Sequence, residues 1–388
     1  MKKVIFIVID GLGDKSISQF GNLTPLAAAK TLNLDWLAKN GFGGLLKPFK
    51  FSWQKYPASD TCHLALFGYD PGIYYLGRGP YEALGIGLKL KKNDLALRAN
   101  FAFGDESFKV LDRRAGRIEK TRQLIRVLSG KTIKGVKFLL KKSFGHRAVL
   151  ILRGDNLSDK ISDSDPKREG LKIKKVLPLE KSSRAAFTAG ILNEFLFQVP
   201  QVLKKFHLPA NCLLTRGAGF FKEVRSFNDK YHLKAACIAG GNLYKGIGRA
   251  LGMDLIKVEG ANGFSSTNLK GKILAARRAL KLYDFIFLHI KAADSLAEDG
   301  DFKGKKKFIE KIDENLKPLL ALKKTLLVVT ADHSTCSRLK RHCAEPIPTL
   351  IYGAGSDLIE RFSERACRKG KLGKIRQLAL MKKILTLV

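Results

Sequence analysis

The sequence lacks any uncharged hydrophobic run long enough to cross a bilayer, which takes about 20 residues. The N-terminal apolar run Val4–Ile9 ends at Asp10. It is shorter than the roughly 7–15 apolar residues of a secretory signal, and no cleavage-site pattern follows it. We therefore expect a soluble, cytoplasmic protein without a membrane partner.

Closely spaced cysteine pairs are also lacking. The six cysteines form no C-x-x-C pair, so neither a disulfide framework nor a zinc knuckle is expected, and buried thiols are the simplest interpretation. Two of them flank a candidate metal segment and stay open as alternative ligands. The six are Cys62, Cys212, Cys237, Cys336, Cys343 and Cys367.

Acidic residues are scarce, with 35 Asp and Glu against 71 Lys and Arg, giving a formal net charge of +36. Nucleic-acid binders usually concentrate such charge and place aromatic side chains between the basic ones. Here the charge extends along the whole chain, and Lys303–Lys307 reads as the solvated face of an amphipathic helix. No specific nucleic-acid partner is expected, although the charge alone leaves salt-sensitive binding to random duplex open. Part of it would steer an anionic substrate inward.

Hydrophobic residues make up 45% of the chain and gather in short, continuous, β-branched runs. Strands apolar on both faces are typical of a parallel sheet covered by helices. The sequence thus predicts an α/β fold with strands at Val4–Ile9, Phe285–Ile290, Leu326–Thr330 and Pro348–Tyr352. Helices are predicted from Thr24–Pro25 to Asn40–Gly41 and from about Asn268 to Tyr283.

The middle of the chain has shorter strands, turns richer in Gly, Asp and Asn, and more arginine. We interpret it as a smaller α+β domain inserted into the α/β domain. The predicted division is 1–77 for the first part of a metal-binding, phosphatase-like domain, 78–228 for an inserted substrate-enclosing domain, and 229–388 for the second part.

Three of the apolar strands lead into aspartate: Asp10, Asp294 and Asp332, the last followed by His333. Because ligands bind beyond the carboxyl ends of parallel strands, these side chains are expected at one edge of the sheet. One such aspartate is often only a helix cap. Three, one of them paired with histidine, favour a site for Mg²⁺, Mn²⁺ or Zn²⁺.

Ser59 stands in Pro57–Leu64, at the start of an apolar stretch. A serine that opens a helix exposes its hydroxyl where backbone N–H groups attract an anion. By itself it reads as an N-cap. Beside a metal site it becomes a candidate nucleophile, because a metal can lower the pKa of the hydroxyl.

A series of motifs, in order along nearly the whole chain, resembles the archaeal-type cofactor-independent phosphoglycerate mutases of the alkaline phosphatase superfamily. The motifs are Val8–Asp14, Ser59–Pro71, Gly77–Ala83, Arg98–Ala102, Asp112–Arg117, Leu157–Asp159, Asp163–Pro166, Arg216–Gly219, Leu243–Ile247 and Asp332–Thr335. The resemblance implies an alkaline-phosphatase-like, mostly parallel sheet between helices. It also implies interconversion of 3-phosphoglycerate and 2-phosphoglycerate, a step of glycolysis and gluconeogenesis.

The resemblance further implies two divalent metal ions, Mn²⁺ or Mg²⁺, with Zn²⁺ or Co²⁺ as alternatives, and no 2,3-bisphosphoglycerate. One ion would be held by Asp10, Ser59, Asp332 and His333, and the other by Asp294, Glu298 and His342. Ser59 would take the phosphate as a phosphoserine and return it to the other hydroxyl of the enclosed glycerate.

A mutase must hold a carboxylate and a phosphate at once, and arginine suits such bidentate clamping. The candidates for this substrate binding are Arg114, Arg147, Arg153, Arg216 and Lys245, with His146 and Lys245 as candidate catalytic groups. In so basic a chain, any one of them can also be a surface charge. An inserted domain that excludes water would separate a mutase from a phosphatase.

Two positions depart from the family pattern, Glu298 and Lys167, where the family has histidine. Glu298 concerns a metal ligand. It leaves two other hypotheses open: a phosphohydrolase or phosphotransferase acting on another small phosphate ester, and a non-catalytic binder. The sequence also leaves the native metal and a homo-oligomer open.

Overall fold

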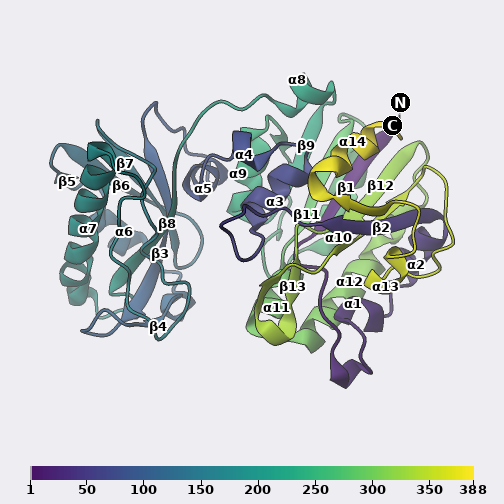
Figure 1. Ribbon diagram of the computed structural model, residues 1–388, viewed down its shortest axis with the longest axis horizontal. Coiled ribbons are helices and arrows are strands. Elements are labelled where there is room, and N and C mark those ends of the chain that lie inside the picture. The colour runs from purple at the N-terminus through teal and green to yellow at the C-terminus, as the bar shows by residue number, and fades with distance from the viewer. Residues whose placement is uncertain (1) are drawn as a thin grey trace. The chain divides into compact units, whose positions relative to one another are not determined.

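The computed structural model describes residues 2–388, which divide into two compact units. The larger unit comprises the chain up to Tyr75 together with Val224–Val388, and the smaller one is Leu76–Glu223. Figure 1 shows both, with the N- and C-terminal ends of the chain in the larger unit. The division expected from the sequence, 1–77, 78–228 and 229–388, stays a prediction about which parts fold as domains.

Within residues 2–388, the larger unit holds an eight-stranded sheet in the order β10-β9-β11-β1-β12-β15-β2-β16. Strands β10, β9, β11, β1 and β12 run parallel, whereas β15 is antiparallel to both of its neighbours and β16 is parallel to β2. The mostly parallel sheet predicted from the sequence is confirmed. The strands are β1 (Lys3–Ile9), β2 (Gly41–Lys47), β9 (Ala235–Ile238), β10 (Asp254–Leu255), β11 (Phe285–Ile290), β12 (Thr325–Thr330), β15 (Ile347–Tyr352) and β16 (Gly373–Arg376), and a separate hairpin consists of β13 (Ser334–Cys336) and β14 (Arg341–Cys343).

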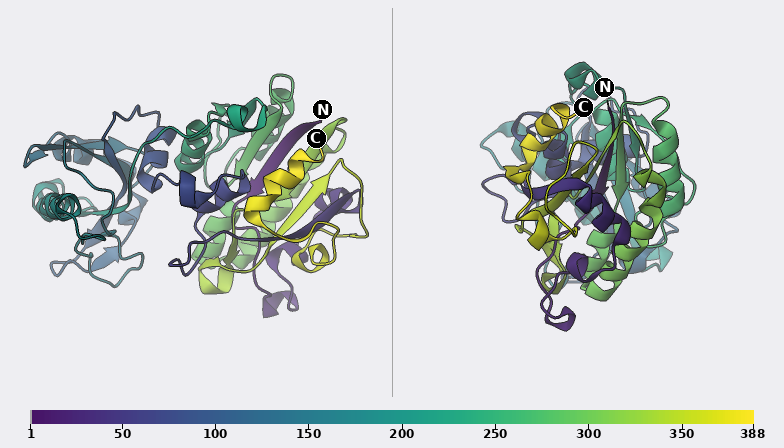
Figure 2. Two further views of the ribbon diagram at one scale, coloured as in Figure 1. Left: turned by 45° about the horizontal axis from the view of Figure 1, so that its top comes forward. Right: turned by 90° about the vertical axis from the view of Figure 1, so that its right-hand side faces the viewer.

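Helices cover both faces of this sheet (Figure 2, right). Helices α2, α10 and α12 pack together on one face, and α3 packs against α9 on the other. Two-sided cover explains why β1, β11 and β12 are continuously apolar and buried. The helices are α1 (Pro25–Ala28), α2 (Leu32–Lys39), α3 (Ser59–Leu66), α4 (Pro71–Tyr74), α8 (Phe227–Tyr231), α9 (Asn242–Ala250), α10 (Leu269–Ala279), α11 (Ala292–Asp299), α12 (Phe302–Leu320), α13 (Glu364–Cys367) and α14 (Leu380–Leu385), with short 3-10 turns η1 (Ser18–Phe20), η4 (Ser337–Leu339) and η5 (Gln377–Ala379).

The helix predicted from Thr24 to Asn40 is wrong as a single element, because α1 ends at Ala28 and α2 begins at Leu32. The interruption has a tertiary cause. The carboxylate of Asp313, on α12, accepts hydrogen bonds from the backbone N–H groups of Asn33 (3.1 Å) and Leu34 (2.7 Å). It supplies the cap that the first turn of α2 needs.

The smaller unit is an α+β sandwich around a sheet in the order β4-β3-β7-β6-β5, with β8 also paired to β3. Helices α6 and α7 share a hydrophobic core with one face of the sheet. On the other face, Ala83 of α5 packs with Ala96, Val149 and Ile151. The elements are α5 (Arg78–Gly85), β3 (Leu95–Gly104), β4 (Val110–Asp112), η2 (Ala115–Arg117), α6 (Arg122–Leu128), β5 (Thr132–Ile133), β6 (Val136–Lys142), β7 (Arg147–Arg153), α7 (Ser183–Leu203), η3 (Lys204–Phe206) and β8 (Cys212–Phe220).

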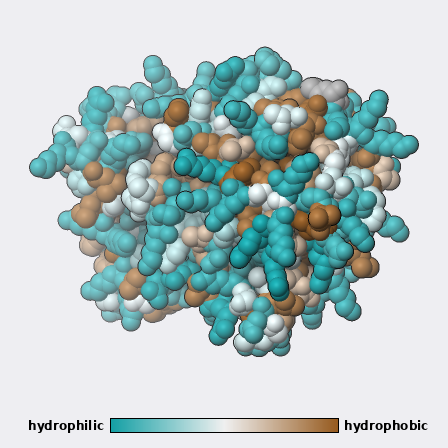
Figure 3. Space-filling view, turned by 45° about the vertical axis from the view of Figure 1, so that its right-hand side comes forward, coloured by the Kyte–Doolittle hydropathy of each residue, from teal (hydrophilic) through white to brown (hydrophobic). Residues whose placement is uncertain are grey.

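The solvated basic helix face predicted at Lys303–Lys307 is wrong for one of its lysines. Lys305 is fully buried, and its ammonium donates to Gly13 O (3.1 Å), Asp14 Oδ2 (3.0 Å) and Thr335 O (3.0 Å). The other lysines of this run are exposed or partly exposed. Figure 3 shows hydrophilic side chains over much of one face, with hydrophobic ones scattered among them.

The expectation that all cysteines are thiols is also wrong, because Cys336 and Cys343 form a disulfide across the β13–β14 hairpin. Their Cα atoms are 5.9 Å apart, a separation that fits a disulfide. The other four cysteines are free and buried. Within residues 2–388, none of the helices combines the length and the hydrophobicity that a membrane span needs.

Candidate metal and phosphate site

The candidate site lies at the carboxyl ends of three adjacent parallel strands, β11, β1 and β12. Asp10 directly follows β1, Asp294 lies in the first turn of α11 just after β11, and Asp332 with His333 follows β12. All four side chains are fully buried. The structure thus brings together the residues for which the sequence predicts a common edge.

Two overlapping groups of side chains could each hold a metal ion. In the first, ligand atoms of Asp10, Asp332 and His333 lie within 4.8 Å of one another, and in the second those of Asp294, His333 and His342 do. His333 belongs to both groups, and its ring stacks on that of His342 with centroids 3.7 Å apart. His342 is held in place because its Nδ1 pairs with Pro57 O at 2.9 Å.

Ser59 is the first residue of α3, after an extended backbone at Ala58. Its Oγ lies 3.1 Å from His333 Nε2, so the hydroxyl reaches the residue that both groups share. The first backbone N–H groups of a helix have no acceptor within the helix, and they favour an anion next to the hydroxyl. One turn later, His63 Nδ1 pairs with Ser59 O at 2.7 Å.

The electrostatics of the site favour a cation. Burial opposes the charge of His333, but Asp332 and Asp294 raise its pKa to about 9. Burial and the neighbouring Asp332 raise the pKa of Asp10 to about 6. Asp332 Oδ2 is buried and lies 3.1 Å from His333 Nε2, so both atoms are placed to ligate one ion. Three buried carboxylates beside two imidazoles fit a divalent cation.

Lys291 is the charged residue of this site that the sequence prediction omitted. Its ammonium donates to Asp10 Oδ1 (3.2 Å) and to Asp294 Oδ2, so it bridges the two candidate ligand groups. Burial opposes its charge, but Asp10 and Asp294 raise its pKa well above the usual value. In the sequence, Lys291 is linked to the site only by its position, directly after a buried strand and three residues before Asp294.

A second set of omitted residues orients the ligands from behind. Tyr244 OH (2.5 Å) and His289 Nε2 (3.1 Å) both contact Asp10 Oδ2, and their rings stack with centroids 3.5 Å apart. Thr335 Oγ1 donates to Asp294 Oδ1 at 2.6 Å. Such outer contacts fix the orientation of metal-ligating carboxylates. Tyr244 and Thr335 lie in the motifs Leu243–Ile247 and Asp332–Thr335, but these contacts join separate strands and helices, so the motifs do not predict them.

Glu298 lies at the edge of the site. Its Oε1 is 3.7 Å from His342 Nε2, and its side chain is 39% exposed. It is absent from both groups of ligand atoms within 4.8 Å, although its position on α11, one turn after Asp294, leaves it close to them. Its assignment as a ligand stays a prediction.

The predicted substrate arginines and His146 belong to the smaller unit, whereas Lys245 lies on α9 of the larger one. Arg216, on β8, is the cross-strand partner of Arg98 on β3, and Arg147, on β7, is that of Asn100. Arg153 donates to both carboxylate oxygens of Asp94, at 2.7 and 2.8 Å, so that carboxylate already occupies two of its donors.

Three further predicted residues have distinct surroundings. Arg114 precedes η2, and its backbone N–H donates to Asp112 Oδ1 at 2.7 Å. Burial, with Arg147 and Arg98, lowers the pKa of His146 to about 3, so its imidazole is neutral near pH 7. Lys245 follows Tyr244, whose hydroxyl contacts Asp10, and burial lowers the pKa of its ammonium.

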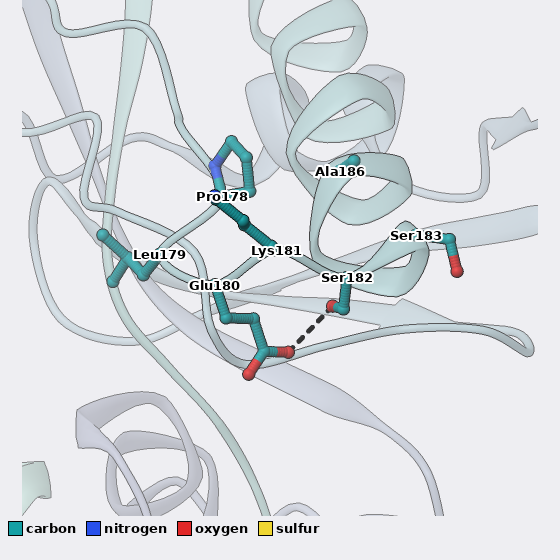
Figure 4. Close-up of a pocket in the computed structure, with 7 residues that line it drawn as sticks. All are labelled: Pro178, Leu179, Glu180, Lys181, Ser182, Ser183 and Ala186. Carbon is teal, nitrogen blue, oxygen red and sulfur yellow. Dashed lines mark hydrogen bonds between the residues drawn. The ribbon is translucent and has the colours of Figure 1, made fainter.

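Figure 4 shows a surface pocket elsewhere in the smaller unit, at the start of α7. There Ser182 Oγ donates to Glu180 Oε1 at 2.9 Å, and Ser183 begins the helix. The lining residues all lie between 178 and 186, and none of them is a predicted site residue. We therefore assign none of the candidate chemistry to this pocket.

Comparison with known proteins agrees with a site of this kind. The family model described as the Metalloenzyme superfamily matches residues 2–386, which assigns the chain to a class of metal-dependent enzymes. Two curated relatives are each named as 2,3-bisphosphoglycerate-independent phosphoglycerate mutase 1. The relative from Archaeoglobus fulgidus is 46% identical, over 97% of this chain and 96% of its own length. The relative from Methanocaldococcus jannaschii is 44% identical, over 99% and 97%.

Solved structures agree with these relatives. A cofactor-independent phosphoglycerate mutase from Thermoplasma acidophilum is 35% identical, covers 100% of both chains and has a TM-score of 0.67. A protein of Pyrococcus horikoshii is 33% identical, covers 100% of this chain and 97% of its own, and has a TM-score of 0.82. The chain belongs to the family of 2,3-bisphosphoglycerate-independent phosphoglycerate mutases.

Proposed function

We propose that the protein is an isomerase that interconverts 3-phosphoglycerate and 2-phosphoglycerate through a phosphoserine at Ser59, without 2,3-bisphosphoglycerate. The observation that carries this proposal is the position of Ser59 Oγ, at the start of α3 and 3.1 Å from the imidazole that both candidate ligand groups share. The reaction belongs to glycolysis and gluconeogenesis, and we place the protein in the cytoplasm.

We assign one divalent ion to Asp10, Ser59, Asp332 and His333, and a second to Asp294, Glu298 and His342. The oxygen and imidazole donors suit Mn²⁺ or Mg²⁺, with Zn²⁺ or Co²⁺ as alternatives. When bound, the ions would lower the pKa of the serine hydroxyl and balance the charge of the phosphate. Tyr244, His289 and Thr335 would keep the carboxylates in orientation, since each already contacts one of them.

In the first half-reaction, Ser59 Oγ forms a bond to phosphorus while the bond from phosphorus to the glycerate oxygen breaks. The serine gives its proton to solvent, and the released glycerate oxygen takes one from Lys245, our candidate donor. In the second half-reaction, the other glycerate hydroxyl attacks the phosphoserine and gives up its proton, with the neutral His146 as our candidate acceptor. The bond from phosphorus to Ser59 Oγ breaks, and the serine oxygen regains a proton from solvent.

We assign Arg114, Arg147, Arg153 and Arg216, with Lys245, to the carboxylate and phosphate of the substrate. Guanidinium groups bind both anions in a bidentate manner. Arg153 would first have to share or leave its pair with Asp94. The smaller unit would also enclose the glycerate and exclude water, which keeps the phosphoserine from being hydrolysed.

The test is an assay of 3-phosphoglycerate with Mn²⁺, scored for 2-phosphoglycerate and for free phosphate. We expect 2-phosphoglycerate without added 2,3-bisphosphoglycerate, and no activity in EDTA. Ser59→Ala should retain the fold and lose on the order of 10⁴–10⁶ in rate. Free phosphate as the main product would instead support the alternative, a related phosphohydrolase. Absence of a trapped phosphoserine at Ser59 would contradict the mechanism.

A further inference from the structure

Strand β3 has two chemically different faces. Its residues Leu95, Leu97 and Ala99 belong to the core under α6 and α7. The alternate residues Arg98 and Asn100 point to the opposite face, because successive side chains of a strand alternate. Arg216 is the cross-strand partner of Arg98, and Arg147 is that of Asn100, so all four side chains share this face. The sheet thus gathers three arginines where α5 covers it.

Helix α5 approaches this face unusually closely. A Cβ added at Gly79, in the first turn of α5, would lie 2.0 Å from Ala96 O of β3. A Cβ at Gly219, on β8, would lie 1.8 Å from Leu76 O, just before the helix. Both positions need glycine because backbone occupies that space. This close approach brings Glu82, on α5, to the arginines of the sheet.

Glu82 is the carboxylate around which these arginines gather. Arg98 Nη1 donates to Glu82 Oε1 at 2.9 Å, and Arg78 Nε donates to the same oxygen at 3.3 Å. Arg147 and Arg216 add longer-range attraction. Burial opposes the charge of Glu82, but Arg98 and Arg78 lower its pKa to about 2. Glu82 is 4% exposed and Arg98 is 5% exposed, so water screens their interaction little.

Four guanidinium groups act on Glu82, those of Arg78, Arg98, Arg147 and Arg216. The nearby Asp165 pairs with Arg113 at 2.8 Å and also attracts Arg216. Within residues 2–388, Arg216 Nε is buried without a hydrogen-bond partner. A phosphoglycerate carries about −2.5 to −3 near neutral pH, a charge opposite in sign to that of these guanidinium groups.

We propose that Glu82 is a positioning residue for this arginine cluster, holding Arg98 and Arg78 so that the cluster distinguishes phosphoglycerate from inorganic phosphate. The inference rests on the proposed function for the identity of the ligand. Glu82 itself does not touch the substrate. Its carboxylate reduces the repulsion among the guanidinium groups and fixes their spacing, which matters for a ligand with two anionic groups. A single phosphate can follow displaced arginines, whereas a carboxylate and a phosphate at fixed separation cannot.

The test compares binding of 3-phosphoglycerate and of inorganic phosphate by calorimetry, with the Ser59→Ala change in every protein to prevent turnover. We expect Glu82→Gln to weaken 3-phosphoglycerate binding by about tenfold or more. The affinity for phosphate should change by less than about threefold, because the gain of one net positive charge offsets part of the affinity that is lost when the arginines move. Glu82→Asp keeps the charge and should recover part of the preference for 3-phosphoglycerate over inorganic phosphate. It also tests the inference if Glu82→Gln does not fold.

Asn193→Ala is the matched control for a merely structural effect. Asn193, on α7, bonds both the N–H and the carbonyl of Val176 at 2.8 Å, so its loss destabilises the same unit. We expect it to leave the preference unchanged. An equal preference in the Glu82 variants and the parent would overturn the role of Glu82. A parent that binds phosphate but not 3-phosphoglycerate would overturn the proposed function and, with it, this inference.

Discussion

Lys291→Met is the substitution whose effect depends most sharply on bound metal. The ammonium of Lys291 is the positive group shared by Asp10 and Asp294, and its side chain is only 20% exposed. Without it, two buried carboxylates lose their common partner. Breaking a buried pair in this way costs about 3–5 kcal/mol, and the remaining exposure favours the lower end. For a domain the size of the larger unit, about 3 kcal/mol corresponds to a fall in Tm of roughly 6–12 °C.

This loss should be present in EDTA and should shrink by more than half in saturating Mn²⁺. The bound cations then supply the positive charge that the two carboxylates need, and they stabilise the folded state further by mass action. Thermal unfolding followed by circular dichroism, in EDTA and in Mn²⁺, measures both values. The prediction is therefore a difference between two conditions rather than one destabilisation.

Lys305→Met is the control. Lys305 is buried and paired with Asp14 at 3.0 Å, but neither residue belongs to a candidate ligand group. Lys305→Met should lower the free energy of unfolding by about 3–5 kcal/mol, equally with and without Mn²⁺. If Lys291→Met also lowered the Tm by the same amount under both conditions, the ammonium of Lys291 would not be the counter-charge of the metal site. Our interpretation of the site would then be wrong.

Three other predictions concern single features. Glu298→Ala should lose affinity for one of two Mn²⁺ ions in calorimetry. Glu298→His should bind Zn²⁺ or Co²⁺ in preference to Mn²⁺, because imidazole is a softer donor than carboxylate. If Glu298→Ala binds two Mn²⁺ ions as tightly as the parent, Glu298 is not a ligand. Reduction of the Cys336–Cys343 disulfide, whose cysteines are 7 residues apart, should lower the free energy of unfolding in urea by up to about 2.5 kcal/mol. Cys343→Ser should be as unstable as the reduced protein and indifferent to dithiothreitol, and a parent unaffected by reductant would contradict this. Because the folded-state pKa of His146 lies near 3 and the unfolded value near 6.5, the unfolded chain binds the extra proton between these limits. The free energy of unfolding should thus fall as pH drops from about 6.5 toward 3, and His146 contributes up to about 1.4 kcal/mol per pH unit to this fall. His146→Phe should remove that contribution, which urea titrations at several pH values measure.

Two features could be deduced from the sequence alone: the α/β class and the edge of the sheet at which the candidate metal ligands meet. Short, continuous apolar runs rich in β-branched residues favour strands covered on both faces, and the carboxyl ends of parallel strands lie at one edge of the sheet. For that reason the sequence predicts Asp10, Asp294 and Asp332 at a common edge of the sheet. The hydroxyl of Ser59 was predictable because a helix start has a local signature.

The groups that neutralise or orient these residues become evident only in the folded chain. Lys305 belongs to a basic run typical of a solvated face, yet Asp14 and two carbonyl groups from distant segments bury it. Cys336 and Cys343 pair because a hairpin aligns them. Glu82 and Lys291 meet their partners across separate elements. These cases have the same cause. The partner of a charge or of a thiol is whatever group lies within a few ångströms of it, and the fold, rather than the sequence spacing, places that group.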